Sequence, residues 1–494
     1  MSSKALRPAI LLGLILLCGC SSTSTHNVTQ PEQAGAYYVA ADGDDNNRGT
    51  IDLPWETLQH AADLAAPGST IYIREGVYHQ KLHITNGGSE DAGPVIFSAY
   101  SGETAILDGE GLAVDGLEGL IEINNASYVT IQNLEIRNYQ TADNGEVPAG
   151  IYVHGSGQSI SLLNNRIHSI ANTAAPEGED LSGRDAHGIA VYGTEAEEAL
   201  SDLTIDGNEV YDLVLGSSEA VAVNGNVDSF AITNNKIHDN DNIGIDIIGF
   251  EGTAGDEAVD QARNGMIKGN EVYGISSNHN PSYGASLPNG NYSAGGIYID
   301  GGRSIRVEKN RVYDNDIGIE LASEHKGKLT RDITVQDNLV YRNRLTGIAM
   351  GGYDEDRGGT SDSKVILNTL YQNDLLEGGG NGQLYLQANL SRNTITDNIL
   401  VAGESGVLIS NDYTSSSENT VDGNLYFAET GADEAIWVWK KQEYAGFSAY
   451  QRGTGNDRSS LFADPQFVDA SAGDFRLQPD SRIVNGGSAG AKTD

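Results

Sequence analysis

Three carboxylates stand at matching places in successive segments of this 494-residue chain and could perform acid–base chemistry. Asp246, Asp300 and Glu320 follow the Gly-Ile pairs at 244–245, 296–297 and 318–319. Glycoside hydrolases use two carboxylates about 5 to 9 Å apart, one as general acid and one as base or nucleophile. Because clustered carboxylates raise one another's pKa, one of them can stay protonated and act as the acid. We predict Asp300 as the acid, and Asp246 or Glu320 as the base or nucleophile.

Aromatic and polar residues share the face that carries these carboxylates. When the segments are aligned on an inward-facing Ile or Val, alternate residues point outward. One outward column contains Tyr152, Ala190, Ala222, Asp246, Tyr298, Glu320 and Ala349. The next contains His154, Tyr192, Asn224, Ile248, Asp300, Ala322 and Gly351.

Insertions flank the same segments at 170–186, 250–264, 276–294 and 353–363, and we expect them to form the walls of a groove. Such a groove suits an extended polymer, because aromatic rings stack on sugars and polar side chains bond their hydroxyls. We therefore predict the following substrate-binding residues: Tyr152, His154, His187, Tyr192, Asn224 and Tyr298.

A repeat of about 30 residues must position these side chains. Its Asn anchors are Asn133, Asn165, Asn208, Asn235, Asn270, Asn310, Asn338, Asn368, Asn398 and Asn424. Short alternating segments separated by Gly and Asn indicate strands and turns, and no unit contains an amphipathic helix. Because one unit cannot bury its own apolar face, the copies must stack. We predict an all-β, right-handed parallel β-helix of about ten or more coils, with each Asn in a left-handed turn and bonded from coil to coil.

A second set of residues recurs three positions after the Asn anchor. It consists of His168, Tyr211, His238, Tyr273, Tyr313, Tyr341 and Tyr371. Coils about 4.8 Å apart would stack these rings on one another. We therefore assign His168 and His238 to a structural ladder and not to catalysis.

The net charge of −39 disfavours nucleic acid and anionic membrane surfaces as partners. It also disfavours anionic polysaccharides, unless a cation or a local positive patch offsets the repulsion. A solenoid grows by adding coils to one continuous core, so we expect residues 37–485 to form one elongated domain and the protein to be a monomer.

The N-terminus has the features of an export signal. Lys4 and Arg7 precede the apolar run Ala9 to Leu17, which is too short to span a bilayer. The following Leu17-Cys18-Gly19-Cys20-Ser21 resembles a bacterial lipobox, and implies a signal peptide at 1–20 with Cys20 lipidated. Residues 21–36 would be a flexible tether. We expect an exported, lipid-anchored protein at the outer membrane.

Both ends of the mature chain resemble the ends of exported right-handed β-helix proteins, including family 9 polysaccharide lyases. The N-terminal stretch begins Tyr37-Tyr-Val-Ala-Ala-Asp-Gly-Asp-Asp, and a helix is predicted over Thr57 to Ala66. The C-terminal stretch contains Phe462-Ala-Asp-Pro-Gln-Phe-Val-Asp469 and Asp474-Phe-Arg-Leu-Gln-Pro479. The resemblance implies an N-terminal cap at 37–70 and a closing segment at 437–485.

The resemblance also implies a second chemistry, calcium-dependent β-elimination (or epimerisation) on a uronic-acid polymer. Asp239-Asn-Asp-Asn-Ile-Gly-Ile-Asp246 is similar to the calcium-binding stretch of those lyases, which makes Asp239, Asp241 and Asp246 candidate Ca²⁺ ligands. Those lyases use a Lys as base on the next coil, where this chain has Tyr298. Tyr298, His154 or His187 could substitute for that Lys.

Three functions therefore remain open. A glycoside hydrolase would need no cofactor, and a lyase or epimerase would need Ca²⁺. A non-catalytic surface glycan-binding protein is the third possibility. The missing Lys favours the hydrolase over the lyase, and the carboxylates favour an enzyme over a binding protein. Each of the three would have an extracellular polysaccharide as its partner.

Overall fold

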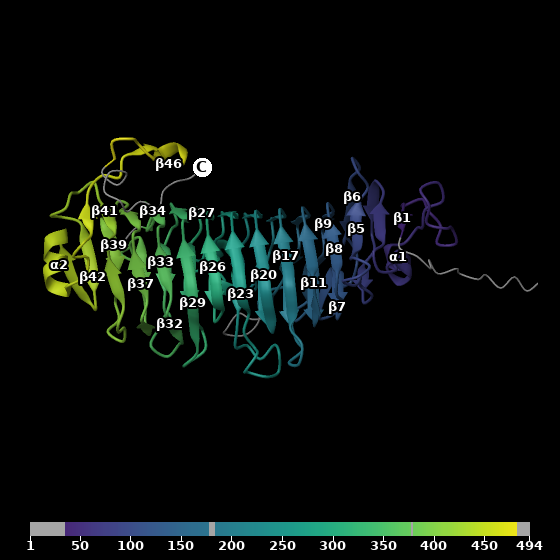
Figure 1. The fold of residues 1–494 in the computed structure, drawn as a ribbon, viewed down its shortest axis with the longest axis horizontal. Helices are drawn as coiled ribbons and strands as arrows, with labels where there is room; N and C mark the ends of the chain where they lie inside the picture. The colour runs from purple at the N-terminus through teal and green to yellow at the C-terminus, as the bar shows by residue number, and fades with distance from the viewer. Residues whose placement is uncertain (1–34, 177–182, 377–378, 482–494) are drawn as a thin grey trace, which may run out of the picture.

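The computed structural model describes residues 35–176, 183–376 and 379–481, which form one right-handed parallel β-helix (Figure 1). Three long sheets run along it, and each coil adds one strand to sheet 1, then to sheet 2, then to sheet 3. The predicted signal peptide, the predicted lipidation site Cys20 and most of the predicted tether lie outside the described residues. Within the described ranges, no helix has the length and apolar character needed to cross a membrane.

The three sheets have 16, 13 and 13 strands. Sheet 1 contains β1 (Ala36–Val39), β2 (Thr70–Ile73), β5 (Val95–Ala99), β8 (Val129–Gln132), β13 (Ile160–Leu163), β17 (Leu200–Asp206), β20 (Val227–Thr233), β23 (Arg263–Lys268), β26 (Arg303–Glu308), β29 (Leu329–Gln336), β33 (Lys364–Ile366), β37 (Thr394–Thr396) and β40 (Thr420–Asp422), with β12 (Gly157–Gln158), β32 (Gly359–Ser361) and β36 (Leu390–Ser391) beside this path. Sheet 2 contains β3 (Gly76–Tyr78), β6 (Ala105–Asp108), β9 (Glu135–Arg137), β14 (Arg166–His168), β18 (Glu209–Tyr211), β21 (Lys236–His238), β24 (Glu271–Tyr273), β27 (Arg311–Tyr313), β30 (Leu339–Tyr341), β34 (Thr369–Tyr371), β38 (Ile399–Val401), β41 (Leu425–Phe427) and β44 (Leu461–Phe462). Sheet 3 contains β4 (Leu82–Ile84), β7 (Leu117–Asn124), β11 (Val147–Gly155), β16 (His187–Gly193), β19 (Val221–Gly225), β22 (Ile245–Ile248), β25 (Gly295–Asp300), β28 (Ile317–Ala322), β31 (Thr346–Met350), β35 (Leu384–Leu386), β39 (Val407–Ser410), β42 (Ile436–Trp439) and β43 (Gln442–Ala445).

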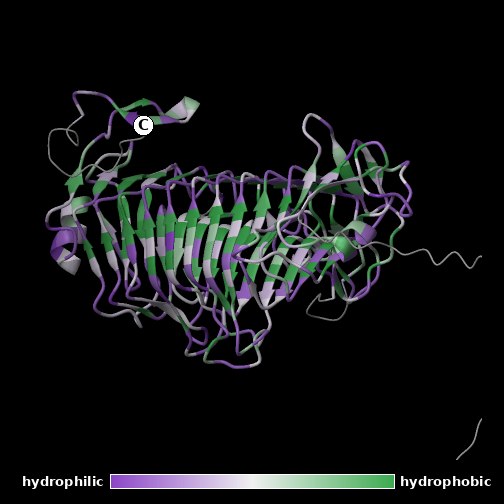
Figure 2. Cartoon of the chain, turned by 45° about the vertical axis from the view of Figure 1, so that its right-hand side comes forward, coloured by the Kyte–Doolittle hydropathy of each residue, from purple (hydrophilic) through white to green (hydrophobic). Residues whose placement is uncertain are grey.

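The core is a continuous stack of aliphatic side chains between the three sheets. Ile245, Ile297, Ile319 and Ile348, on neighbouring strands of sheet 3, are all fully buried. Figure 2 shows the hydrophobic residues concentrated along the strands and the hydrophilic ones in the turns and loops. Stacking therefore buries an apolar face that one coil alone would expose, which is the physical reason that the repeat predicts this fold.

A ladder of Asn side chains runs along the turns between sheets 1 and 2 and connects each coil to the next. Each Nδ2 donates to the Oδ1 of the next Asn, at 3.1 Å from Asn165 to Asn208 and 2.9 Å from Asn310 to Asn338. The complete ladder is Asn165, Asn208, Asn235, Asn270, Asn310, Asn338, Asn368, Asn398 and Asn424. The predicted bonding is confirmed.

The prediction that the ladder Asn itself adopts the left-handed conformation is wrong. The residue before it does so, for example Asn164 (φ 53°) and Asp337 (φ 56°). Asn133 (φ 59°) belongs to this second position, because the amide of the next residue, Leu134, donates to the ladder. One residue adopts the left-handed conformation and the next contributes the ladder side chain, because the left-handed turn lets that next side chain point into the core.

Asn310→Ala should lower the free energy of unfolding by about 3 kcal/mol, because it leaves several buried polar groups without partners. Asn310 donates to Ile267 O and accepts from the backbone and side-chain amides of Asn270. The shift of the urea midpoint measures the loss, with the exposed Asn144→Ala as control. An unchanged midpoint for Asn310→Ala would contradict the ladder's contribution to stability.

The second predicted ladder is present in sheet 2. The rings of His168, Tyr211, His238, Tyr273, Tyr313 and Tyr341 stack in order with centroids 4.8–5.0 Å apart. Tyr371 does not continue the parallel stack, because Phe475 contacts both Tyr341 and Tyr371, at 5.1 and 5.3 Å. His168 and His238 thus lie in a structural stack, away from the carboxylates of sheet 3.

Both ends of the coil stack are covered. At the N-terminal end, α1 (Leu58–Leu64) buries Leu58 and Ala61, and the Thr57 side chain caps it by accepting from His60 N, so the predicted short helix is confirmed. At the other end, α2 (Phe447–Thr454) packs Tyr450 on Trp437, with ring centroids 5.3 Å apart. The antiparallel pair β45 (Phe467–Asp469) and β46 (Asp474–Leu477) then folds back over sheet 2 (Figure 1).

Candidate active site

The outward face of sheet 3 has the register that the repeat predicts. Tyr152, Ala190, Ala222, Asp246, Tyr298, Glu320 and Ala349 are paired in this order across neighbouring strands. In the second column, His154, Tyr192, Asn224 and Ile248 pair in the same way. The second column breaks after Ile248, which bridges Gly301 and not Asp300. Asp300 nevertheless pairs with Ala322 on the next strand.

Asp246 and Asp300 are buried carboxylates, and the largely buried Glu219 belongs to the same group. Asp246 is 3% and Asp300 is 5% exposed. Burial, followed by the charges of Glu219 and Asp300, raises the pKa of Asp246 well above its ordinary value. Burial also raises the pKa of Glu219 and Asp300 well above theirs, with further contributions from neighbouring carboxylates. Because each ionised carboxylate opposes ionisation of the others, the group retains protons at a pH where isolated carboxyls have lost them.

Glu320 and Glu324 extend this group along the next coil. Burial raises the pKa of Glu320 to about 8, with a smaller contribution from Glu324, so the Glu320 carboxyl is neutral at pH 7. The backbone amide of Glu324 donates to Asp300 Oδ1 at 2.9 Å, and its Oε1 lies 3.5 Å from the Tyr298 hydroxyl. Burial is the larger cause, and the charge of Asp300 the next, that raises the pKa of Tyr298 well above 10. Tyr298 is therefore a hydrogen-bond donor at neutral pH and not an available base.

Glu219 is the main member of the site that the sequence analysis missed. It lies two residues before the inward-facing Val221, where strict alternation would also point it inward. Residues 217–220 form a bend, however, and β19 begins only at Val221. Glu219 Oε2 lies 3.7 Å from His187 Nδ1. The sequence did contain a signal for Glu219: it lies just before β19, and the neighbouring strand β16 begins with His187.

His187 is fully buried and serves to position other groups. Its Nδ1 donates to the Glu219 carbonyl at 3.1 Å, and its Nε2 accepts from the Tyr192 hydroxyl at 3.3 Å. Burial lowers the pKa of His187 to about 4, so the ring is neutral at pH 7. Both nitrogens are engaged within the protein, which leaves neither as a ready base for substrate.

Asn224, predicted to bind substrate, instead fixes the turn after β22. Its Nδ2 donates to Glu251 Oε2 at 2.9 Å, and its Oδ1 accepts from the Thr253 hydroxyl at 3.0 Å. Asn224 is 1% exposed, so its amide has no free face toward solvent. The contact positions the exposed Glu251 beside the carboxylates, where its charge contributes to the raised pKa of both Glu219 and Asp246.

The remaining predicted substrate-binding residues form an aromatic surface on the N-terminal side of the carboxylates. Tyr152 and His154 stack with centroids 4.4 Å apart, and Tyr192 meets Tyr152 edge-on at 5.9 Å. His154 Nε2 is held 2.8 Å from Glu122 Oε1. An aromatic surface beside an acidic centre is an arrangement that binds sugars, by ring stacking and by bonds to hydroxyls.

The structure does not bring together the three aspartates predicted as calcium ligands. Asp239 is 66% exposed and accepts from His238 Nδ1 at 2.8 Å. Asp241 accepts from Leu215 N and lies 3.8 Å from Arg184, while Asp246 faces Glu219 and Asp300. Among the described residues, no group of three or more His, Cys, Asp or Glu side chains has an arrangement that could hold a metal ion. The residues present therefore do not fit the implied calcium site, because each carboxylate is held by a different part of the coil.

Several known proteins resemble this chain. Residues 37–310 match the family described as Pel9A-like, right-handed β-helix region. The chain is 46% identical over 452 residues to the uncharacterized protein YwoF of Bacillus subtilis (strain 168), covering 91% of this chain and 92% of that protein. It is 33% identical over 172 residues to the pectate lyase PEL9 of Emericella nidulans, covering 32% of this chain and 38% of that lyase.

A solved structure supports the architecture. The GH136 lacto-N-biosidase from Eubacterium ramulus superposes with a TM-score of 0.51 at 15% identity, over 87% of this chain and 67% of that one. At this identity the likeness concerns the fold alone. The family match spans more than half of the chain, and the similarity to YwoF spans nearly all of both proteins. This chain belongs to the Pel9A-like right-handed β-helix family.

Proposed function

We propose that this protein is a polysaccharide-degrading enzyme, and that it acts as a glycoside hydrolase. One observation carries the proposal: Asp246 and Asp300 are buried on the outward face of sheet 3, the largely buried Glu219 lies beside them, and each has a raised pKa. Glycoside hydrolysis needs one protonated and one ionised carboxyl group at the same bond. A group that shares fewer protons than it has carboxylates supplies both forms at once.

Asp300 is the proposed general acid. It transfers its proton to the glycosidic oxygen as the bond from that oxygen to C1 breaks. Asp246 or Glu219, in its ionised form, takes a proton from the water that attacks C1. Alternatively it attacks C1 itself, and water then cleaves the resulting glycosyl ester with the ionised Asp300 as base. Glu320, neutral at pH 7, and Tyr298 act as hydrogen-bond donors to the substrate in this scheme.

The second candidate is a lyase or epimerase, which the family match and the pectate lyase relative favour. Both reactions need a base for the proton next to the uronate carboxyl group. Tyr298 stands where the resemblance implies a Lys, and burial raises its pKa well above 10. His187 is neutral but bonded on both nitrogens, and His154 is paired with Glu122. Among the described residues, the three candidate bases that the sequence suggests are thus neutral or engaged by other side chains, which makes elimination the weaker proposal.

A panel of polysaccharides decides among the three functions. The full-length protein is incubated with each polymer while reducing ends and the ultraviolet absorbance of unsaturated uronates are both recorded. New reducing ends without that absorbance are expected. Product that absorbs would overturn the hydrolase in favour of a lyase, and binding without any product would leave a glycan-binding protein.

We further propose export and lipidation at Cys20, since an extracellular polymer can be reached only from outside the cell. Metabolic labelling with a palmitate analogue should mark the wild-type protein but not Cys20→Ala. Labelling of that variant would contradict the assignment.

A further inference from the structure

The outward column of sheet 3 continues past the carboxylates to a residue that the proposed reaction does not use. After Glu320 it contains Ala349 on β31 and Tyr385 on β35. Neighbouring strands lie about 4.8 Å apart, so the backbone of Tyr385 is about 10 Å beyond that of Glu320. Ala349 is fully buried, whereas Tyr385 is half-buried between the inward-facing Leu384 and Leu386. Tyr385 therefore lies on the outer surface of sheet 3, just beyond the last carboxylate of the column.

Two other tyrosines join Tyr385 from loops that follow strands of sheet 3. Tyr353 belongs to the insertion at 353–363 after β31, and Tyr413 follows the end of β39. The Tyr413 hydroxyl donates to the Tyr353 carbonyl oxygen at 2.7 Å. Burial is the largest cause, and the neighbouring Tyr413 the next, that raises the pKa of Tyr385 above its ordinary value. Three separate segments thus bring together Tyr353, Tyr385 and Tyr413, which we call the tyrosine cluster.

A chain of contacts connects the tyrosine cluster to the carboxylates. The Arg357 guanidinium group lies 4.5 Å from the centre of the Tyr353 ring and donates to the Glu324 carbonyl oxygen at 3.2 Å. The backbone amide of Glu324 in turn donates to Asp300 Oδ1 at 2.9 Å. Burial, and then the charge of Glu324, raises the pKa of Tyr353. The tyrosine cluster therefore adjoins the carboxylate group without belonging to it.

Tyr353 presents its ring to solvent in a fixed position. It is 39% exposed, and within the described ranges it is the only exposed Phe, Trp or Tyr side chain. The cation–π contact from Arg357 holds the ring, and the bond from the Tyr413 hydroxyl holds the backbone. A ring that is already held loses little conformational freedom when a ligand binds to it. Tyrosine also suits a sugar, because its ring packs on apolar C–H groups while its hydroxyl bonds to polar ones.

The column has a similar arrangement on the other side of the carboxylates. Two alanines separate Asp246 from Tyr152, which belongs to the aromatic surface described above. One alanine separates Glu320 from Tyr385. Such small side chains do not project from the sheet, so a polymer can follow the column from one set of rings, across the carboxylates, to the other.

We infer that the tyrosine cluster is a sugar-binding subsite, which holds the part of the polysaccharide that extends from the carboxylates toward the C-terminal end of the β-helix. The inference rests on the proposed action on a polysaccharide. It applies to hydrolysis and to elimination alike, because both reactions must position the polymer. Contacts away from the bond that breaks supply binding free energy that holds this bond at the carboxylates. Chains that reach the cluster should therefore be better substrates than shorter ones.

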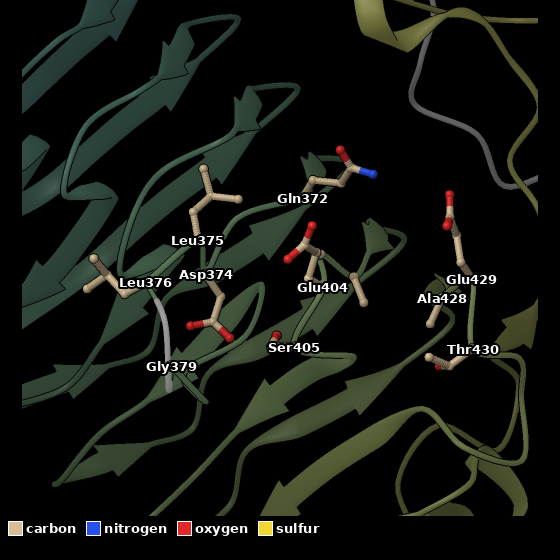
Figure 3. Close-up of a pocket in the computed structure, with 12 residues that line it drawn as sticks. Gln372, Asp374, Leu375, Leu376, Gly379, Glu404, Ser405, Ala428, Glu429 and Thr430 are labelled. Carbon is tan, nitrogen blue, oxygen red and sulfur yellow. The ribbon is translucent and has the colours of Figure 1, made fainter.

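A cavity on the same coils offers the polymer another path (Figure 3). It has a volume of about 820 Å³ and lies beyond the ends of β34, β38 and β41, on the turns that lead into sheet 3. Leu375, Leu376 and Glu404 are among the residues that line it, and its described lining contains no aromatic side chain. The cavity therefore lacks rings that could stack on sugars, which favours the tyrosine cluster.

The test measures kcat/KM on oligosaccharides of increasing length, prepared from the polymer that the panel identifies. On the longest, Tyr385→Ala should lower kcat/KM by about tenfold, and the double variant Tyr353→Ala/Tyr385→Ala by about 100-fold. The defect should shrink as the chain is shortened, because an oligosaccharide that does not reach the cluster has no contact to lose. Tyr385→Phe keeps the ring and should retain most of the rate. If Tyr385→Ala does not fold, Tyr353→Ala alone provides the test, since Tyr353 is exposed.

Two controls locate the effect. Tyr72→Ala removes a half-buried tyrosine from the outward face of sheet 1 and should leave the length dependence unchanged. Leu375→Ala removes a 49% exposed side chain from the cavity. A length-dependent loss in Leu375→Ala, but not in the tyrosine variants, would assign the polymer to the cavity and overturn the inference.

The remaining outcomes separate the inference from the proposed function. Tyrosine variants as active as wild type, or a loss of equal size on short and long chains, would contradict the subsite while leaving a polysaccharide-active enzyme. If no polymer is cleaved, the proposed function fails, and the affinities of wild type and the double variant for the panel polysaccharides decide the inference. Weaker binding by the double variant would support the subsite. Equal binding, or no binding by either protein, would overturn it.

Discussion

Asp300→Asn should lower kcat on the natural polymer by about 1,000-fold, the usual contribution of a general acid, and leave the fold intact. Asn has the shape of Asp, and its carbonyl oxygen can still accept the 2.9 Å bond from Glu324 N. What it loses is the proton that the leaving oxygen requires. The measurement is kcat and KM for wild type and variant on the polymer that the panel identifies.

A leaving group that needs no protonation separates catalysis from structure. On an aryl glycoside with an acidic phenol, the Asp300→Asn defect should shrink to about tenfold or less, because the phenolate departs unaided. Asp337→Asn is the control: Asp337 lies in the turn between sheets 1 and 2, with φ 56°, which Asn also adopts. Full activity of Asp300→Asn on the polymer would remove Asp300 from its role.

The repeat predicts the fold because its periodicity reports burial directly. An inward aliphatic residue on each coil and an Asn in the turn between sheets 1 and 2 of successive coils leave few ways to satisfy both the apolar stack and the buried amides. The same periodicity fixes the register of sheet 3, and it correctly predicts that Asp246, Tyr298 and Glu320 lie in one column. The alignment of the repeat is wrong by one residue at Asn133, because the next coil has two adjacent Asn residues and only the second of them, Asn165, belongs to the ladder.

The site is less predictable, because its key contacts come from bends and turns. Glu219 precedes its strand, Glu324 follows its strand, and Glu251 lies in an insertion. None of the three obeys the alternation that assigns a side chain to a face. Asn224 does obey it, yet the turn after β22 captures its amide, which no pattern of period two could predict. Partners within the protein decide whether an outward polar residue is free for a ligand.

Membership of the Pel9A-like family and the proposed hydrolysis are compatible, because a fold does not determine the reaction. The chemistry depends on the side chains that the coils present. Tyr298 replaces the Lys that the resemblance implies, and the three candidate calcium ligands are held apart. The proposed hydrolysis instead assigns the acid and the base to one group of carboxylates, Glu219, Asp246 and Asp300.

Glu320→Gln should stabilise the protein at alkaline pH and leave its stability at pH 4.5 unchanged. Burial raises the pKa of Glu320 to about 8, compared with 4.5 in the unfolded chain. Between these values the folded state holds a proton that the unfolded state has released, so the wild-type free energy of unfolding falls as the pH rises. The variant, which resembles the protonated carboxyl, avoids this loss. The difference should reach roughly 4 kcal/mol above pH 8.

Denaturant unfolding of wild type and variant from pH 4.5 to 9 measures this difference. Other buried carboxylates titrate in both proteins and cancel, and Glu198→Gln, which removes an exposed charge, should show no comparable trend. A constant difference across the range would mean that Glu320 is already ionised in the folded protein. Glu320 would then be available as a base at pH 7, and the roles assigned to Asp246 and Glu219 would have to be shared with it. The pH dependence of stability therefore tests which carboxyl groups are protonated and which can act as a base, without any knowledge of the substrate.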